Sequence, residues 1–116
     1  MKIRIKGNSL RYRLTKSDVD KFSKEGYVEE AIHFGPQSLV YALKSAPVDH
    51  LTADFRSNKI TLFIPFSMTE EWATTDRVGF ENTESQLYLL IEKDFKCLDN
   101  VAEDQSDNYP NPLAAC

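Results

Sequence analysis

The chain is poor in cysteine, glycine and proline, and it has no long apolar run. Four Gly and five Pro in 116 residues exclude collagen-like and low-complexity chains. No stretch approaches the roughly 20 apolar residues of a membrane helix. The basic start is not followed by the apolar segment of a secretory signal. We therefore expect one globular domain in the cytoplasm, with no membrane contact and no need of disulfides.

Charge is distributed unevenly along the chain, although the formal net charge is only −4. Residues 1–16 hold six basic side chains and no acid, whereas residues 92–116 hold two basic and six acidic side chains. An acidic surface disfavours nucleic acid as a partner, but a basic patch on it still attracts anions locally. The two ends of the chain therefore carry opposite charge.

The first fourteen residues alternate between apolar and basic side chains on both sides of a Gly7-Asn8-Ser9 turn, which predicts a β-hairpin. Side chains in a strand point to opposite faces in turn. One face of the hairpin should face the core with Ile3, Ile5, Leu10, Tyr12 and Leu14. The other face should carry Lys2, Arg4, Lys6, Arg11 and Arg13.

Two short helices are predicted, over residues 16–25 and 68–76. Thr15 is placed to cap the first helix and Gly26 to end it. For the second, Ser67 and Glu70 have the spacing of a capping box, and Met68 and Trp72 should face inward. Further strands are expected over residues 27–34, 38–44, 51–55, 59–64, 78–81 and 87–91.

These elements follow one another in the same order twice, as two ββαββ halves over residues 2–45 and 51–92. The pattern predicts an α+β fold, a mostly antiparallel curled sheet or small barrel with two short helices. Residues 1–98 form the single domain in this interpretation. Residues 99–116 form an acidic, Pro-containing, extended C-terminal tail.

The basic hairpin face is the strongest candidate site, with Arg4, Lys6, Arg11 and Arg13 as ligand-binding residues. Like charges on neighbouring strands repel, so an anionic group is expected beside them. A small anionic ligand, an acidic segment of a partner and the chain's own acidic tail all remain open as that group. The face lacks the exposed aromatic side chains of proteins that bind single-stranded nucleic acids, which again disfavours nucleic acid as a partner.

Two other functions compete with this non-enzymatic binding module. One is an enzyme that handles a phosphorylated substrate inside a small barrel, with Glu92 or Asp94 as base or metal ligand. The other is a metal site that uses Cys97 and Cys116, joined by His33 and His50, although no paired short spacing supports it. No catalytic motif is present, so we favour the binding module, with no catalytic residue, no cofactor and no metal.

Three segments near the ends of the chain are distinctive: the opening MKIRIKGNSLRYRL (1–14), EKDFKCL (92–98) and DNYPNP (107–112). In these segments the chain resembles an uncharacterised bacterial family known only as a domain of unknown function. The resemblance runs along the whole chain and implies a small bacterial protein. It implies no catalytic residue, cofactor or substrate.

Overall fold

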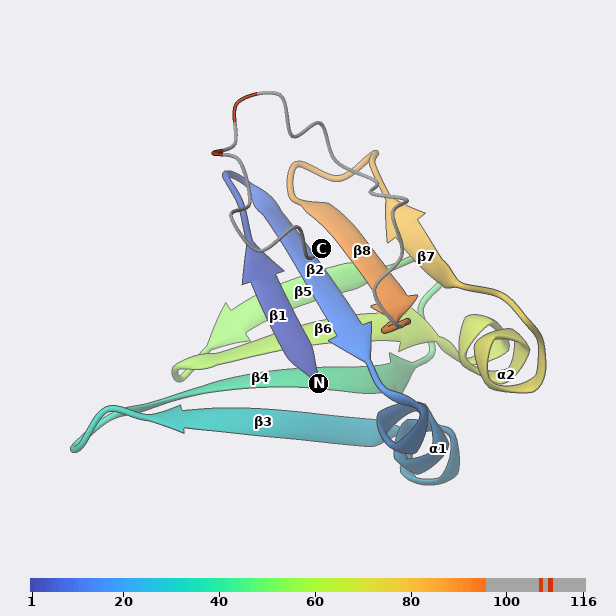
Figure 1. Ribbon diagram of the computed structural model, residues 1–116, viewed down its shortest axis with the longest axis horizontal. Coiled ribbons are helices and arrows are strands. Elements are labelled where there is room, and N and C mark those ends of the chain that lie inside the picture. The colour runs from blue at the N-terminus through green and yellow to red at the C-terminus, as the bar shows by residue number, and fades with distance from the viewer. Residues whose placement is uncertain (96–106, 108, 110–116) are drawn as a thin grey trace.

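The computed structural model describes residues 1–95, 107 and 109, and this part of the chain forms eight strands and two helices. Their order matches the predicted order of elements (Figure 1). The strands are β1 (Lys2–Ile5), β2 (Ser9–Leu14), β3 (Tyr27–His33), β4 (Ser38–Ala46), β5 (Thr52–Arg56), β6 (Lys59–Pro65), β7 (Gly79–Asn82) and β8 (Tyr88–Lys93). The helices are α1 (Lys16–Glu25) and α2 (Phe66–Thr74).

The strands form two separate four-stranded sheets, which confirms the α+β class but corrects the prediction of one curled sheet or a barrel. Sheet A has the order β1-β2-β8-β7 and sheet B the order β3-β4-β6-β5. The pairs β2–β8 and β4–β6 are parallel, so each sheet is mixed. Each parallel pair joins two antiparallel hairpins: β4–β6 joins hairpins that follow each other in the sequence, whereas β2–β8 joins the first hairpin to the last. Sheet A therefore combines the two ends of the described strands, which a chain-order interpretation missed.

Helix α1 begins and ends as the sequence predicts. The Thr15 hydroxyl accepts the Asp18 backbone N–H, and the Asp18 carboxylate accepts the Thr15 backbone N–H, which completes a capping box. Gly26 ends the helix in the left-handed region with φ 70°, which a glycine adopts without strain. Val19 and Phe22 are its buried residues.

Helix α2 corrects the predicted start at residue 68 and the predicted Ser67–Glu70 capping box. It begins at Phe66, and Pro65 occupies the N-cap position without a side-chain cap. Ser67 therefore lies inside the first turn of α2, and its hydroxyl is not at the N-cap position. The inward direction of Trp72 is confirmed: the ring is fully buried, and its Nε1–H donates to the Val78 carbonyl at 2.9 Å. Met68 is only partly buried.

The core lies between the two sheets, and both helices pack together at one end of it (Figure 1). Tyr12 of sheet A is fully buried and meets Tyr41 of sheet B edge to face, with ring centroids 6.2 Å apart. The Tyr12 hydroxyl donates to the Ile60 carbonyl at 3.4 Å, and burial raises the pKa of Tyr12 far above its ordinary value. These side chains fix sheet A against sheet B.

The first hairpin turns its alternating side chains as predicted, except at one position. Leu10, Tyr12 and Leu14 are buried and Ile3 packs against the core, whereas Ile5 is 61% exposed. Ile5 lies opposite Leu10, at the end of β1.

The predicted C-terminal tail lies mostly outside the described residues. Neither helix of the described chain is long and apolar enough to cross a membrane.

Candidate functional site

The outer side of sheet A carries the basic side chains that the sequence singled out. We call Lys2, Arg4, Lys6, Arg11 and Arg13 the basic face. In the β1–β2 pairing, Arg4 lies directly opposite Arg11 and Lys2 directly opposite Arg13. Opposite residues of an antiparallel pair are about 5 Å apart, so each pair sets two positive charges side by side. Alternation brings all five cations to one side of the hairpin, away from buried Tyr12 and Leu14.

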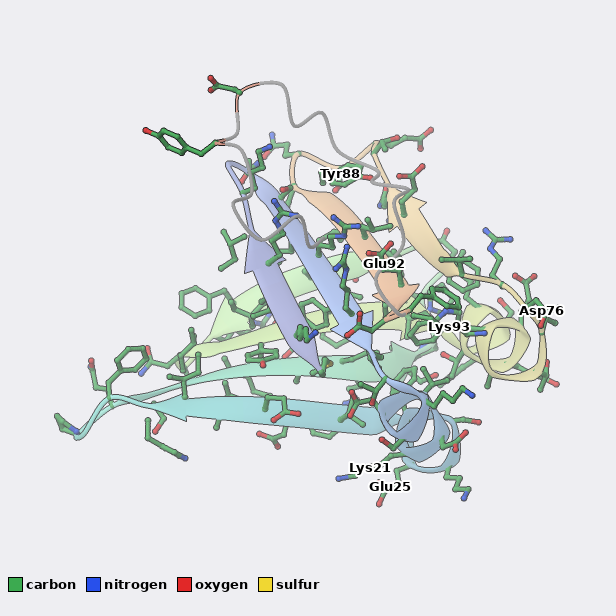
Figure 2. All side chains as sticks on the ribbon, viewed as in Figure 1. Lys21, Glu25, Asp76, Tyr88, Glu92 and Lys93 are labelled. Atoms are coloured by element: carbon green, nitrogen blue, oxygen red, sulfur yellow. The ribbon has the colours of Figure 1, made fainter. Side chains whose placement is uncertain are left out.

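Glu92 of β8, labelled in Figure 2, accepts hydrogen bonds from two members of the basic face. Its Oε1 accepts from Arg11 Nε at 2.8 Å and from Arg13 Nε at 2.8 Å. The side chains of Arg11 and Glu92 are only 14% and 16% exposed, so this pair is sheltered from water, whereas Arg13 is 41% exposed. The sequence interpretation named Glu92 as a base or metal ligand, but the structure places it as a partner of the two arginines.

Parallel pairing explains how Glu92 reaches this position. It lies opposite Arg13 in the β2–β8 register, and no local pattern indicates a contact between residues 79 positions apart. The neighbouring Asp94 forms an ion pair with Lys2 at 3.0 Å, and its backbone N–H donates to the Leu14 carbonyl at 2.8 Å. The end of β8 thus supplies two acids to the basic face.

Arg4 and Lys6 lie farther along the hairpin than Glu92 and Asp94 do. Arg4 pairs in register with Arg11, and Lys6 follows β1 at the turn, where its N–H donates to the Ser9 carbonyl. Arg4, Lys6 and Arg11 each take part in further polar or electrostatic interactions. The structure brings together all four predicted ligand-binding residues, Arg4, Lys6, Arg11 and Arg13, and their role in binding stays a prediction.

An open pocket of about 260 Å³ lies beside the basic face, over β7 and β8. Arg77, Glu81 and Glu92 supply its charged groups. Arg77 also stacks on the Phe80 ring at 4.4 Å and bonds Glu71 at 3.2 Å. Two carboxylates against one guanidinium make this pocket a poor receptor for an anion. Its remaining lining residues are Val78, Gly79 and Leu90.

Tyr88 begins β8 and lies on the same side of that strand as Glu92 (Figure 2). Its hydroxyl donates to Glu81 Oε2 at 2.6 Å. This bond, aided by partial burial, raises the pKa of Tyr88 above its ordinary value.

A glycine is required at residue 79 because β7 and β8 approach closely there: a Cβ would lie 2.0 Å from the Ile91 carbonyl oxygen. The β7–β8 pair therefore admits no side chain at residue 79.

A second charged cluster surrounds the amino group of Met1. The ammonium lies 2.9 Å from Asp18 Oδ2 and 3.2 Å from Glu30 Oε1. Burial alone would raise the pKa of Asp18, but its bonds with the ammonium and with Thr15 outweigh burial and hold this pKa below its ordinary value. The Tyr41 hydroxyl donates to the Met1 carbonyl at 2.8 Å. This cluster ties the start of β1 to α1 and sheet B.

The candidate metal ligands do not assemble within the described residues. His33 bonds the Ser38 hydroxyl at 2.7 Å, and His50 contacts the neighbouring Asp49. No group of three or more His, Cys, Asp or Glu in the described chain could hold a metal ion. Cys97 and Cys116 lie outside the described residues, and the sequence prediction for them stays untested.

Comparison with known proteins gives a family and no activity. No curated protein and no solved structure matches the chain. The model of a family of unknown function, DUF7009, matches residues 1–113, almost the whole chain. The match agrees with the resemblance read from residues 1–14, 92–98 and 107–112. The chain therefore belongs to the family of unknown function DUF7009.

Proposed function

We propose that the protein is a non-enzymatic binding module whose basic face receives an acidic segment of another protein. The observation that carries the proposal is the register of β1 on β2, which sets Arg4 against Arg11 and Lys2 against Arg13. Five cations share this side of the β1–β2 hairpin, and the two acids at the end of β8, Glu92 and Asp94, bond Arg11, Arg13 and Lys2. Like charges that lie opposite each other on neighbouring strands repel, so further carboxylates would stabilise this side of sheet A.

The members of the basic face have different roles in this proposal. Arg11 is sheltered and held by Glu92, so it stabilises the face more than it contacts a partner. Lys2 and Arg13 are more exposed, and Arg4 and Lys6 lie beyond the reach of the Glu92 bonds. An incoming carboxylate would join or replace existing pairs, each of which contributes only about 0.2–1 kcal/mol at the surface. Binding should therefore need several acids at once and weaken with salt.

The spacing of the cations favours a peptide over a compact anion. Alternate residues of a strand lie about 7 Å apart, so Lys2, Arg4 and Lys6 form a row longer than one phosphate group. An extended acidic chain has the same repeat. The adjoining pocket holds two carboxylates, which disfavours a phosphorylated small molecule there. The enzyme alternative also needs cations inside a closed barrel, whereas sheets A and B stay separate.

Three further features belong to the same proposal. The ββαββ halves over residues 2–45 and 51–92 form an internal repeat, which is supported by the matching orders β1-β2-β8-β7 and β5-β6-β4-β3. The protein works in the bacterial cytoplasm, and the family resemblance supports its bacterial origin. It uses no cofactor.

The test is a titration of the full chain with a hexaglutamate peptide at low and at high salt. The double variant Arg4→Gln/Lys6→Gln should lose at least about fivefold in affinity, whereas Lys21→Gln/Lys24→Gln, an equal charge change on exposed positions of α1, should keep it. High salt should weaken binding. No binding by the wild-type chain, or equal losses in the two double variants, would overturn the proposal. Binding of inorganic triphosphate without peptide binding would favour the small-anion alternative.

A further inference from the structure

Strand β1 is an edge strand of sheet A. In the order β1-β2-β8-β7, it has β2 on one side, and no other strand of the described chain pairs with it. An unpaired strand edge presents backbone N–H and C=O groups that another extended chain can bond. This edge adjoins the basic face, because Lys2, Arg4 and Lys6 belong to β1 and the turn that follows it.

The hydrogen bonds of the hairpin show which residues of β1 face this edge. The Lys6 N–H donates to the Ser9 carbonyl, so residues 6 and 9 form a hydrogen-bonded pair. Such pairs alternate with non-bonded pairs in an antiparallel ladder. Arg4 and Arg11 are then a bonded pair, whereas Ile3–Tyr12 and Ile5–Leu10 are not. The N–H and C=O groups of Ile3 and Ile5 therefore point away from β2.

Contacts on the other side of β2 agree with this assignment. The Asn8 carbonyl accepts from the Tyr88 N–H, and the Leu14 carbonyl accepts from the Asp94 N–H. Even-numbered residues of this stretch therefore bond β8, and odd-numbered residues bond β1. The same alternation leaves Ile3 and Ile5 turned toward the free edge. The Ile5 side chain is 61% exposed, so the described chain leaves this end of the edge uncovered.

The side chains around this edge restrict what can pair with it. Residues that lie opposite each other on neighbouring strands turn their side chains to the same face. A strand added to β1 would set alternate residues beside Lys2, Arg4 and Lys6, and the intervening residues beside Ile3 and Ile5. The first set must be acidic and the second apolar. A second copy of β1 would bring cations against cations, which disfavours pairing of the protein with itself.

The other strand edges carry different charges. Edge strand β3 holds Glu29 and Glu30, and edge strand β7 holds Glu81. Edge strand β5 holds Asp54 together with Arg56. Of the four edge strands in the described chain, only β1 carries cations and no acid. Charge complementarity therefore selects β1 for an acidic partner.

We infer that the edge of β1 receives an extended segment of a partner protein, with alternating acidic and apolar residues, as a fifth strand of sheet A. This inference rests on the proposed function and adds to it the backbone pairing and the residue pattern of the partner. Main-chain bonds to Ile3 and Ile5 supply the pairing, as in other cases of strand addition. The basic face selects the acidic residues.

The test uses the full chain and a Glu-Val-Glu-Val-Glu-Val-Glu peptide with two alternate sets of N-methylated amides. In an antiparallel addition, the valines lie opposite Ile3 and Ile5 and their amides face β1, so methylation of the valines should abolish binding. Methylation of the glutamates should leave the affinity within about threefold of that of the unmethylated peptide. A parallel addition reverses the two outcomes. Equal binding, or equal loss, of both methylated peptides would overturn strand addition.

Variants of the protein test the same edge from the other side. Ile5→Pro removes the N–H that points away from β2, and a proline is tolerated at such an edge position. It should lower affinity for the alternating peptide at least about tenfold, whereas Ile5→Val should not. Retained affinity in Ile5→Pro with an unchanged melting temperature would contradict the inference. If this variant does not fold, the methylated peptides decide the question.

Failure of this inference is distinguishable from failure of the proposed function. Dependence of hexaglutamate binding on Arg4 and Lys6, together with equal behaviour of the two methylated peptides, would retain the binding module and remove strand addition. Absence of binding for both hexaglutamate and the alternating peptide would remove both. A peptide with the same residues in blocks, acids first and valines last, should bind more weakly than the alternating one.

Discussion

At the residue scale, Glu92 is the side chain on which the local structure of the basic face depends. One oxygen of its carboxylate accepts from both Arg11 and Arg13 at 2.8 Å, and its side chain is 16% exposed. A carboxylate in this place separates two guanidinium groups that would otherwise repel each other across a sheltered surface. Hydrogen bonds to charged groups contribute more than neutral ones when water is partly excluded.

Replacement of Glu92 by glutamine should therefore destabilise the protein. The amide keeps the size of the side chain but loses its charge, so Arg11 and Arg13 lose the charged acceptor of their hydrogen bonds. We expect the free energy of unfolding to fall by about 1–3 kcal/mol, measured by urea denaturation. Glu84→Gln, at an exposed position between β7 and β8, is the matched control and should change it by less than about 0.5 kcal/mol. Equal effects of both substitutions would show that the two arginine bonds contribute nothing.

Asp18 gives a pH dependence whose sign follows from its environment. The ammonium of Met1 and the Thr15 groups hold the pKa of Asp18 below its ordinary value, despite an opposing effect of burial. A carboxyl whose pKa is lower in the folded state stabilises the fold above its unfolded pKa and loses this contribution as pH falls through the folded pKa. The free energy of unfolding should therefore decline below about pH 4.

Asp18→Asn should flatten this decline, because the amide does not titrate. Urea denaturation between about pH 5 and pH 3 measures the difference between the variant and the wild-type chain. Asp20→Asn changes an exposed acid on the same helix and should keep the wild-type slope. Identical slopes for wild type and Asp18→Asn would contradict the assignment.

At the element scale, the two helices illustrate when local sequence patterns predict boundaries. Thr15 and Asp18 have a capping-box spacing, and α1 begins where that pattern indicates. Ser67 and Glu70 have the same spacing, but Pro65 has φ −55° and already meets the backbone requirement of a helix start. The helix therefore begins at Phe66, before the serine can cap it.

This difference predicts losses of stability of different size for two equivalent substitutions. Thr15→Ala removes the hydroxyl that accepts the Asp18 N–H, and should lower the free energy of unfolding by about 1 kcal/mol. Ser67→Ala removes a hydroxyl with no capping bond and should change it by less than about 0.5 kcal/mol. Thermal or urea unfolding measures both. A larger loss of unfolding free energy in Ser67→Ala than in Thr15→Ala would indicate that Ser67 caps α2, and would contradict this assignment.

The sheets show what the sequence leaves open. Alternation in residues 2–14 predicts the hairpin and its two faces, because period two depends only on the local chain. The partner of β2 is β8, about 79 residues away, and no local pattern encodes that choice. The same gap hides the contact of Glu92 with Arg11 and Arg13. The cations of the candidate site were thus predictable from sequence, whereas their acidic partners required the fold.

At the scale of the whole molecule, one core joins both sheets and both helices. Its buried residues come from β2, β7 and β8 of sheet A, from β3, β4 and β6 of sheet B, from α1 and α2, and from Leu51 before β5. Among the described residues, neither sheet has a second layer of its own, since the two sheets cover each other and the helices close one end (Figure 1). A sheet that lost its partner would expose its apolar face. Sheets A and B should therefore unfold together.

Trp72 is the side chain that best tests whether sheets A and B unfold cooperatively. Helix α2 follows β6 of sheet B, and the Trp72 Nε1–H bonds the Val78 carbonyl, which directly precedes β7 of sheet A. Trp72→Phe removes this bond and part of a fully buried ring, so it should lower the free energy of unfolding by about 1–3 kcal/mol.

Native-state hydrogen exchange separates cooperative from independent unfolding. The slowest amides of β8 and of β4 should exchange with the same opening free energy in the wild-type chain, and Trp72→Phe should lower both by the same amount. Two sheets that unfold separately would instead give opening free energies more than about 1 kcal/mol apart, or a loss confined to one sheet. Equal values would mean that the basic face on sheet A depends for its shape on sheet B, because neither sheet persists without the core they share.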